Sequence, residues 1–301
     1  MDMLLNLRAF LATARTGNFS EAARQLNVVP SVVAKRVSHL ESAVGVQLFS
    51  RSTRQVSLTE PGTKFLSKAR ALVEDFDGIV SGMAREEVAG ELEGHLRVKT
   101  PTSLGVLYLA EILSAFQRAH PRITMDVTLV DRSINPVEEG FDVALGGISS
   151  SYDGVLDEPL CPIRQVVCAA PEYLAEHGMP AHPRDLADYP CIVFRPTGTT
   201  WMFRTQRGPI EVEVPARLAT NDTSMMLAAA RAGNGIAVLP TYISREALAA
   251  GGLVALLPDF PLQEIWLKAL VPTRKAGTRR IQALLAHLKE QLSPAPPWER
   301  A

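Results

Sequence analysis

The sequence predicts an α/β protein built from two unlike parts. In the first 60 residues, apolar residues recur at helical spacing in three short segments, and two short apolar runs follow them. Between residues 66 and 83, apolar residues alternate steps of three and four, which favours one long helix. From residue 92 onward, short apolar runs alternate with helical segments, as in a parallel sheet covered by helices. A chain of 301 residues has room for these parts as separate compact units.

Composition and motifs argue against several classes of protein. The N-terminus lacks a secretory pattern, and no run approaches the roughly eighteen apolar residues that span a bilayer, so we expect a soluble cytoplasmic protein without a membrane partner. The three cysteines, Cys161, Cys168 and Cys191, form no CxxC pair, which favours reduced thiols over a redox switch. No metal-ligand spacing, nucleophile motif or complete dinucleotide loop is present. We therefore expect no metal, no cofactor and no enzymatic activity.

The charge of the chain is unevenly distributed. The whole chain has a net charge of −1, but residues 1–60 hold seven basic and four acidic side chains, a net charge of +3. Phosphate binding depends on the local patch rather than on the total charge. The N-terminal part is therefore suited to binding nucleic acid.

Two short helices are expected at the start of the chain. Apolar residues from 4 to 14 predict the first helix, and residues 16–18 are suited to ending it. Ser20 is expected to cap a second helix, residues 21–26, with its side-chain oxygen. Residues 27–29 then turn the chain toward a third helix.

The third helix, residues 30–44, has two unlike faces. Pro30 suits its first position and Gly45 suits its end. A helix-turn-helix with a polar face on its last helix enters the DNA major groove, where the N-terminal half of that helix meets base edges. The apolar stripe consists of Val33, Val37, Leu40 and Val44, and the polar face consists of Ser31, Lys35, Ser38 and Ser42.

A hairpin is expected after the third helix. Residues 46–49 and 55–58 predict two strands around a polar tip. Arg51 and Arg54 in such a tip fit a wing that contacts the DNA backbone or minor groove, whereas the alternative is a pair of solvated turn residues. The candidate DNA-contacting residues are Ser20, Ser31, Val32, Lys35, Arg36, Ser38, Arg51, Thr53 and Arg54.

The order of these motifs resembles the LysR-type transcriptional regulators. The motifs are Phe10-Leu11-Ala12, Gly17-Asn18-Phe19-Ser20-Glu21-Ala22-Ala23, Gly45-Val46-Gln47-Leu48-Phe49 and Leu58-Thr59-Glu60-Pro61-Gly62. The resemblance implies that residues 1–60 form a winged helix-turn-helix that binds double-stranded operator DNA. The chain departs from the family at Val29-Pro30 and Ala34, because neither Val29 nor Ala34 has a polar side-chain atom that caps the helix or contacts a base.

A linker helix and hinge are expected in residues 61–90. Thr59 is suited to capping this helix, and Pro61 is tolerated in its first turn. The resemblance implies that the helix pairs two heads in a homodimer or homotetramer, whereas the alternative is a helix packed on its own head. Its apolar residues, at coiled-coil spacing, are Leu66, Ala69, Leu72 or Val73, Phe76, Ile79 or Val80, and Met83.

The resemblance extends over nearly the whole chain, through Asn221-Asp222 and Gly233-Asn234-Gly235. It implies an effector-binding domain, residues 91–293, with two α/β lobes around a cleft like that of periplasmic binding proteins. We expect lobe I at residues 91–162 and 266–293, lobe II at residues 163–265, and a flexible tail at residues 294–301. The predicted strands are residues 96–100, 123–130, 143–145, 166–169, 192–194, 236–239 and 266–271, and the main helices are residues 103–120, 223–232 and 279–292.

The candidate effector-binding residues lie beyond the carboxyl ends of strands, where ligands of such sheets bind. Thr102 and Ser103 at a helix start can hold a carboxylate, so a small carboxylate or aromatic acid is the expected effector; the alternative is that these hydroxyls only cap the helix. Gly146-Gly147 replaces an arginine common in the family, which leaves space but one fewer anion anchor. The candidates are Thr100, Thr102, Ser103, Arg132, Phe194, Arg195, Trp201 and Thr223.

Three hypotheses for the function follow. The leading one is a LysR-type regulator whose operator binding is modulated by a small-molecule effector in the cleft, with RNA polymerase considered as a further partner. The second is a cytoplasmic solute-binding protein whose basic head docks on another protein. The third is an enzyme that uses the two-lobed cleft, although no pair of nucleophile and base supports it.

Overall fold

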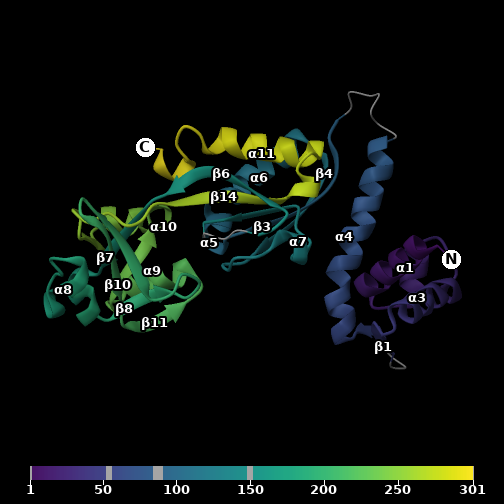
Figure 1. Ribbon diagram of the computed structural model, residues 1–301, viewed down its shortest axis with the longest axis horizontal. Helices are drawn as coiled ribbons and strands as arrows, with labels where there is room; N and C mark the ends of the chain where they lie inside the picture. The colour runs from purple at the N-terminus through teal and green to yellow at the C-terminus, as the bar shows by residue number, and fades with distance from the viewer. Residues whose placement is uncertain (1, 52–55, 84–90, 148–151, 301) are drawn as a thin grey trace. The chain divides into compact units, whose positions relative to one another are not determined.

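The computed structural model describes residues 2–51, 56–83, 91–147 and 152–300. The chain divides into two compact units, one based on residues 1–90 and the other on residues 91–137 and 141–301 (Figure 1). No helix in the described ranges has both the length and the apolar character needed to cross a membrane.

The N-terminal unit is a bundle of helices with one small hairpin. Phe10 lies at the centre of its core, with ring-centroid distances of 5.3 Å to Phe49 and 5.4 Å to Phe65. The predicted order of three helices, a hairpin and a long helix is confirmed. The elements are α1 (Met3–Thr16), α2 (Phe19–Gln25), α3 (Pro30–Val44), β1 (Phe49–Arg51), antiparallel β2 (Val56–Leu58) and α4 (Glu60–Met83).

The caps of the first helices differ in one place from the prediction. Gly17 and Gly45 end α1 and α3 in the left-handed conformation, as predicted. The cap of α2, however, is Asn18, whose side-chain oxygen accepts the backbone N–H groups of Ser20 and Glu21. The prediction of Ser20 as the cap is therefore wrong, because α2 begins at Phe19, so its first unpaired N–H groups are within reach of Asn18.

The first strand of the hairpin also begins later than predicted. One carboxylate oxygen of Glu41 accepts the backbone N–H groups of Leu48 and Phe49, at 2.9 and 3.1 Å. These bonds hold residues 46–48 against the end of α3, so pairing with β2 begins only at Phe49. The start of the second predicted strand, Gln55, lies outside the described residues.

The long helix α4 packs on the head over its first turns. The Thr59 hydroxyl accepts the Gly62 N–H at 3.0 Å, which confirms the predicted cap. Ala69 and Val73 are buried in the core of the head, as the alternative interpretation required. Leu72 and Phe76 are 56% and 45% exposed, so part of the apolar stripe lies on an open face.

The remaining residues of the linker are only partly described. The backbone of α4 extends to Met83, but the side chains of Ile79, Val80 and Met83 lie outside the described set. Residues 84–90, at the end of the predicted linker and hinge, lie outside the described residues.

Lobe I of the C-terminal unit is a mixed five-stranded sheet, not the parallel sheet that was predicted. The strand order is β4-β3-β5-β14-β6; β3 is parallel to β4 and β5, and β14 is antiparallel to β5 and β6. Helices α6 and α11 pack on one face around Phe116 and Leu284 (Figure 1). The strands are β3 (Glu93–Thr100), β4 (Arg122–Leu129), β5 (Val143–Gly146), β6 (Val155–Ile163) and β14 (Ile265–Pro272), and the helices are α5 (Thr102–Leu104), the π-helical turn η1 (Gly105–Leu109), α6 (Ala110–Ala119), α7 (Pro136–Glu139) and α11 (Arg279–Leu292).

Lobe II has a second mixed sheet, in the order β11-β8-β12-β7-β13, with an additional hairpin, β9 and β10. One core lies around Phe203 and another around Met226. The strands are β7 (Gln165–Ala169), β8 (Cys191–Phe194), β9 (Thr200–Thr205), β10 (Gly208–Glu213), β11 (Ala216–Thr220), β12 (Ile236–Pro240) and β13 (Val254–Leu256), and the helices are α8 (Pro171–His177), η2 (Pro183–Asp188), α9 (Thr223–Arg231) and α10 (Thr241–Ala249).

The chain crosses between the lobes twice, and α10 connects them. The first crossing is at Arg164, between β6 and β7, and the second leads from β13 back into β14. Tyr242 near the start of α10 belongs to the core of lobe I, whereas Ala247 near its end belongs to a core of lobe II. The two lobes are therefore joined by helix α10 as well as by the two segments of chain that cross between them.

The C-terminal segment is packed, in contrast to the flexible tail that was predicted. Residues Pro297–Glu299 form the short helix η4, and Trp298 is only 4% exposed. Its ring contacts those of Tyr108 and Tyr242 at centroid distances of 5.2 and 6.0 Å. Arg245 of α10 donates to the carbonyl oxygens of Trp298 and Arg300 at 3.2 Å each. A buried indole makes this segment part of the core of lobe I.

Truncation of Trp298 is expected to destabilise the C-terminal unit. Trp298→Ala removes a buried aromatic ring and should lower the free energy of unfolding by about 3–5 kcal/mol. Trp298→Phe should cost less, because it keeps a ring and removes an indole N–H that has no partner among the described residues. Urea unfolding followed by circular dichroism measures both. The control is Trp266→Ala, at a ring that is 39% exposed; an equal loss in that variant would contradict the assignment.

Candidate functional site

The third helix presents the predicted apolar stripe over most of its length. Val33, Val37 and Leu40 are buried, and they hold α3 against the rest of the head. The prediction is wrong for Val44, which is the last residue of α3 and is 37% exposed. The candidate DNA-contacting residues of α2 and α3 differ in exposure. Ser20, Ser31, Lys35 and Ser38 are exposed, and Val32 and Arg36 are half-buried.

The start of α3 lacks a side-chain cap, as predicted from Val29. The Val29 side chain is 59% exposed, and no side-chain hydrogen bond satisfies the first N–H groups of the helix. Pro30 occupies the first position, where its missing N–H removes one unpaired donor. The exposed start of α3 is therefore open to hydrogen-bond acceptors from solvent or from a ligand.

The wing is described only in part. Arg51 ends β1, and its side chain lies outside the described set. Thr53 and Arg54 lie outside the described residues altogether. Their contact with DNA stays a prediction.

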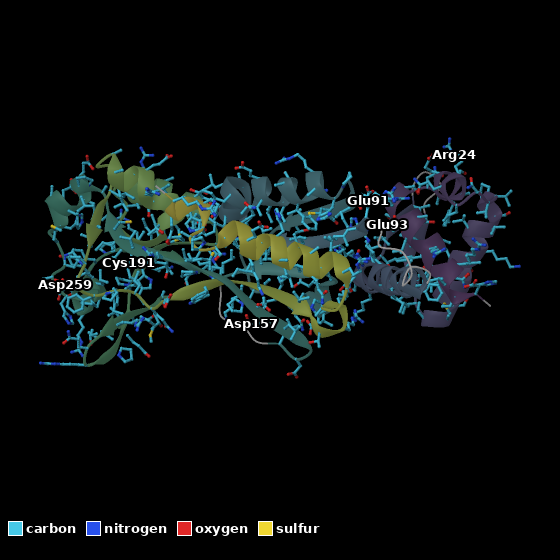
Figure 2. The ribbon with its side chains drawn as sticks, turned by 90° about the horizontal axis from the view of Figure 1, so that it is seen from above. Arg24, Glu91, Glu93, Asp157, Cys191 and Asp259 are labelled. Atoms are coloured by element: carbon cyan, nitrogen blue, oxygen red, sulfur yellow. The ribbon has the colours of Figure 1, made fainter. Side chains whose placement is uncertain are left out.

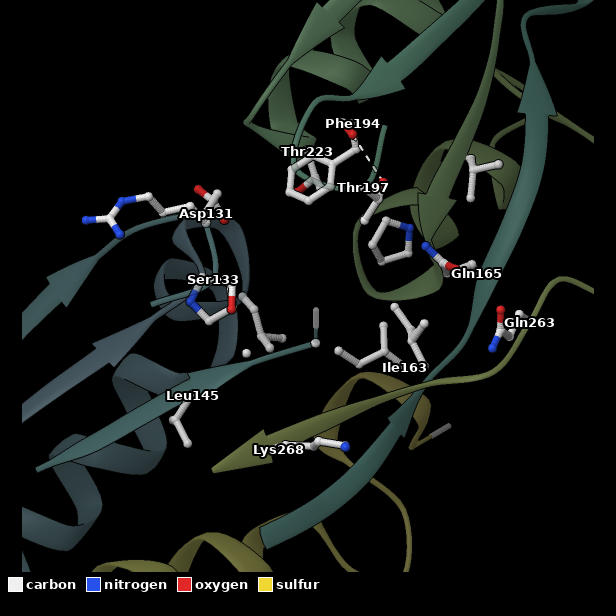
Figure 3. Close-up of a pocket in the computed structure, with 18 of the residues that line it drawn as sticks. Asp131, Ser133, Leu145, Ile163, Gln165, Phe194, Thr197, Thr223, Gln263 and Lys268 are labelled. Carbon is white, nitrogen blue, oxygen red and sulfur yellow. Dashed lines mark hydrogen bonds between the residues drawn. The ribbon is translucent and has the colours of Figure 1, made fainter. Parts of the chain in front are cut away.

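A cleft of about 450 Å³ lies within the C-terminal unit, between the two lobes (Figure 3). This volume is within the usual range for small-molecule sites. Among the predicted effector residues, Arg132, Phe194, Trp201 and Thr223 line it. Most of the remaining wall is apolar, and it includes Leu104, Ile163, Met226, Val238, Leu262 and Ile265.

The other four predicted effector residues do not line the cleft. Thr100 is fully buried, and its hydroxyl donates to the Pro101 carbonyl at 2.9 Å. Arg195 is exposed and donates to the Ala219 carbonyl at 3.1 Å. Thr102 and Ser103 are used in contacts within the protein, described next. Burial or bonding within the protein therefore accounts for the absence of Thr100, Ser103 and Arg195 from the wall of the cleft.

The predicted carboxylate site at Thr102 and Ser103 is already filled by the protein. The Asp131 carboxylate, at the end of β4, accepts the Thr102 N–H through Oδ1 at 2.9 Å. The Ser103 hydroxyl lies 2.6 Å from that of Thr223 and 3.0 Å from that of Tyr242. The structure therefore has the Thr102 N–H and the Ser103 hydroxyl in use within the protein, and a contact of these residues with an effector stays a prediction.

The contact among Ser103, Thr223 and Tyr242 joins the lobes. Ser103 belongs to lobe I, whereas Thr223 begins α9 of lobe II. All three hydroxyls are buried, and burial raises the pKa of Tyr242 above its ordinary value. A neutral phenol in this place can both donate and accept, as a closed group of hydroxyls requires.

Several polar residues that line the cleft were not predicted from the sequence. Lys99 is 4% exposed, and its Nζ donates to the Leu145 carbonyl at 3.1 Å. A side-chain carbon placed at Gly146 would lie 3.6 Å from that Nζ, so a cation lies beside the glycine after all. The signal in the sequence was a lysine inside the predicted strand of residues 96–100. The other polar residues that line the cleft and were not among the candidate contacts are Asp131, Ser133, Gln165, Thr197, Thr200, Tyr242, Gln263, Glu264 and Lys268.

Neither thiol chemistry nor a metal centre is supported by the described residues. Burial raises the pKa of Cys161, Cys168 and Cys191 to about 12, and Figure 2 shows Cys191 among the side chains of lobe II. The thiolate is the reactive form, and at pH 8 it is about one ten-thousandth of each thiol. No group of three potential metal ligands occurs in the described part of the chain.

The cysteines should be unreactive in the folded protein. The thiol reagent DTNB at pH 8 is expected to label none of the three on the time scale of minutes, because each is buried and protonated. In concentrated guanidinium, all three should react. Rapid labelling of any cysteine in the native protein would contradict the burial described above.

Removal of the central hydroxyl between the lobes should destabilise the C-terminal unit. Ser103→Ala leaves Thr223 and Tyr242 without their shared partner, at an expected cost of about 1–3 kcal/mol in urea unfolding. The control is Ser114→Ala, at an exposed serine that bonds only to its own helix. Its expected cost is below about 0.5 kcal/mol. Equal costs would show that the network does not stabilise the unit.

Comparison with known families assigns both parts of the chain. Residues 4–63 match the bacterial regulatory helix-turn-helix protein, lysR family, and residues 89–293 match the LysR substrate binding domain. The sequence is 32% identical to the probable HTH-type transcriptional regulator LtrA of Klebsiella pneumoniae, over 96% of this chain and 95% of LtrA.

Solved structures agree with this assignment. The structure of CrgA, a LysR-type transcriptional regulator from Neisseria meningitidis, is similar with a TM-score of 0.59 and 28% identity, over 96% of this chain and 98% of that one. Full-length AphB of Vibrio cholerae, at 20% identity, shares the fold with a TM-score of 0.60, over 95% and 98% of the two chains. With both of its domains matched in order, the chain belongs to the LysR family of transcriptional regulators.

Proposed function

We propose that this regulator binds operator DNA through α3 and the wing, and that a small molecule in the cleft between the lobes modulates this binding. The observation that carries the proposal is the exposed face of Ser31, Lys35 and Ser38, which lies opposite a buried apolar stripe on one helix. A face held in this way is rigid, yet its side chains are available to the DNA.

The DNA contacts divide into two kinds. Ser31, Val32 and Lys35 lie in the N-terminal half of α3, the part of a recognition helix that meets base edges. Arg36, Arg51 and the remaining candidates supply hydrogen bonds and charge to phosphates. Ala34 offers no polar atom, so Lys35 is the long polar side chain best placed to read a base.

An exposed apolar surface on α4 supports pairing of two chains. The large apolar side chains of Leu72 and Phe76 are 56% and 45% exposed. Burial of these exposed apolar side chains against a second copy of the helix would stabilise a dimer. Two heads joined in this way would read a roughly palindromic operator, as a helix-turn-helix dimer does.

The cleft supports ligand-dependent control. Its walls come from both lobes, with Asp131 and Lys99 on lobe I and Phe194 and Thr223 on lobe II. A molecule that contacts both walls has an affinity that depends on the separation of the lobes, so its binding shifts that separation. Transmission of this shift to the heads is the allosteric step of the proposal.

Substitution of Lys35 should weaken binding to the operator. Lys35→Ala is expected to cost about 1–3 kcal/mol in a gel-shift titration with the DNA upstream of the regulator's own gene, because it removes an exposed cation from the reading face. Lys289→Ala, which removes an exposed cation from α11 of the other unit, is the control and should leave the affinity unchanged. A similar loss in both variants, or no loss at Lys35, would contradict the placement of α3 on DNA.

A further inference from the structure

We propose that the ligand of the cleft has an ammonium group bound by Asp131 and an apolar body held by lobe II. This inference rests on the proposed function, since it names the chemical class of the molecule that would control DNA binding. It departs from the acid that the sequence led us to expect.

Asp131 is the first observation. Its side chain is nine-tenths buried and lines the cleft. Oδ1 accepts the Thr102 N–H at 2.9 Å, and Oδ2 has no hydrogen-bond partner among the described residues. Figure 3 shows Asp131 on one wall of the cleft, facing the wall that carries Phe194 and Thr223. A buried carboxylate with one unpaired oxygen toward a cavity is a binding site for a hydrogen-bond donor.

The charge of Asp131 determines the kind of donor. A carboxylate accepts the strongest hydrogen bonds from cationic donors, and its burial strengthens the attraction. A ligand carboxylate at the same place would meet a negative charge and would find the Thr102 N–H already in use. The Asp131 carboxylate thus already occupies the N–H group at the start of α5. The negative charge of Asp131, which faces the cleft, favours an ammonium group on the ligand.

The other charged residues of the cleft are compatible with this choice. Lys268 is paired with Asp157 at 2.8 Å, and Arg132 and Glu264 are exposed to solvent. Lys99 is buried and donates to the Leu145 carbonyl. A ligand that also has a carboxylate can direct it toward these cations, so an amino acid is tolerated, but the ammonium group is the part that is required.

The opposite wall determines the body of the ligand. Phe194, Trp201, Met226 and Val238 contribute aromatic and aliphatic surface from lobe II, and Ile163 closes the side near the crossing between lobes. Such a wall gains most from a ring or a branched chain, because burial of apolar surface is favourable and aromatic rings pack well on one another. An aromatic amine fits both walls of a cleft of this volume.

Three compounds that differ only in their charged groups test the proposal. Phenylalanine has both an ammonium group and a carboxylate, 2-phenylethylamine has only the ammonium group, and 3-phenylpropionate has only the carboxylate. Each is added to the full-length protein at 10 mM in a thermal-unfolding assay. A ligand that binds the native state raises the melting temperature, and at a fixed concentration the rise is larger for the ligand with the lower Kd.

The expected result is a rise of at least 1 °C with phenylalanine and 2-phenylethylamine, and no measurable rise with 3-phenylpropionate. A rise with 3-phenylpropionate equal to that with the amines would overturn the proposal, as would the absence of a rise with either amine. These outcomes do not depend on any variant, so they decide the question even where a substitution prevents folding.

Asp131→Asn locates the interaction. Its amide oxygen can still accept the Thr102 N–H, whereas the charge and the free acceptor are lost. The affinity for 2-phenylethylamine should fall at least tenfold. Glu264→Gln is the matched control, because it removes an exposed acidic charge from the same cleft and should retain the amine response. An unchanged affinity in Asp131→Asn, with the fold verified by circular dichroism, would overturn the assignment.

Failure of this inference is distinguishable from failure of the proposed function. A protein that forms a specific complex with operator DNA but is not stabilised by the amines remains a regulator with a different effector class. A protein without a specific DNA complex loses the proposed function, while the comparison of the three compounds still reports on the cleft.

Discussion

The C-terminal unit depends on a buried contact between three hydroxyl groups. Ser103 comes from the start of a helix in lobe I, Thr223 from the start of α9, and Tyr242 from the start of α10. Each hydrogen bond of this kind contributes about 0.5–1.5 kcal/mol, and an unpaired buried hydroxyl costs more than that. The lobes therefore have one favourable separation at this point, and the volume of the cleft follows from it.

The packed C-terminal segment reinforces the same junction. Trp298 contacts Tyr108 of lobe I and Tyr242, the residue that also bonds to Ser103. Arg245 on the next turn of α10 holds the backbone of the segment. A movement of α10 relative to lobe I would thus disturb both an aromatic cluster and a hydroxyl network. Packed interfaces of this type change between discrete arrangements more readily than they deform continuously.

Sequence reasoning succeeded where the deciding interactions are local. The boundaries of α3 and α11 follow from Pro30, Gly45 and the apolar spacing of each helix, and these signals lie within a few residues of the element. The direction of β14 was not accessible in the same way. That strand returns from lobe II after a long excursion and pairs antiparallel with β5 and β6, and nothing in its own residues encodes this. The core position of Trp298 was missed for the same reason, since its partners are distant in sequence.

The starts of α3 and α5 show that local sequence predicts which donors a site has, but not which group binds to them. At α3 the absence of a polar residue at Val29 is visible in the sequence, and the structure has the same uncapped start. At Thr102 the neighbouring residues indicated free N–H groups and hydroxyls ready for an anion. The group that occupies this place is Asp131, 29 residues further along the chain, brought there by the pairing of β3 with β4. A short polar motif therefore defines the donors of a site, but tertiary structure decides whether a ligand or the protein itself receives them. Under our proposal, that decision changes the charge of the ligand group that binds in the cleft.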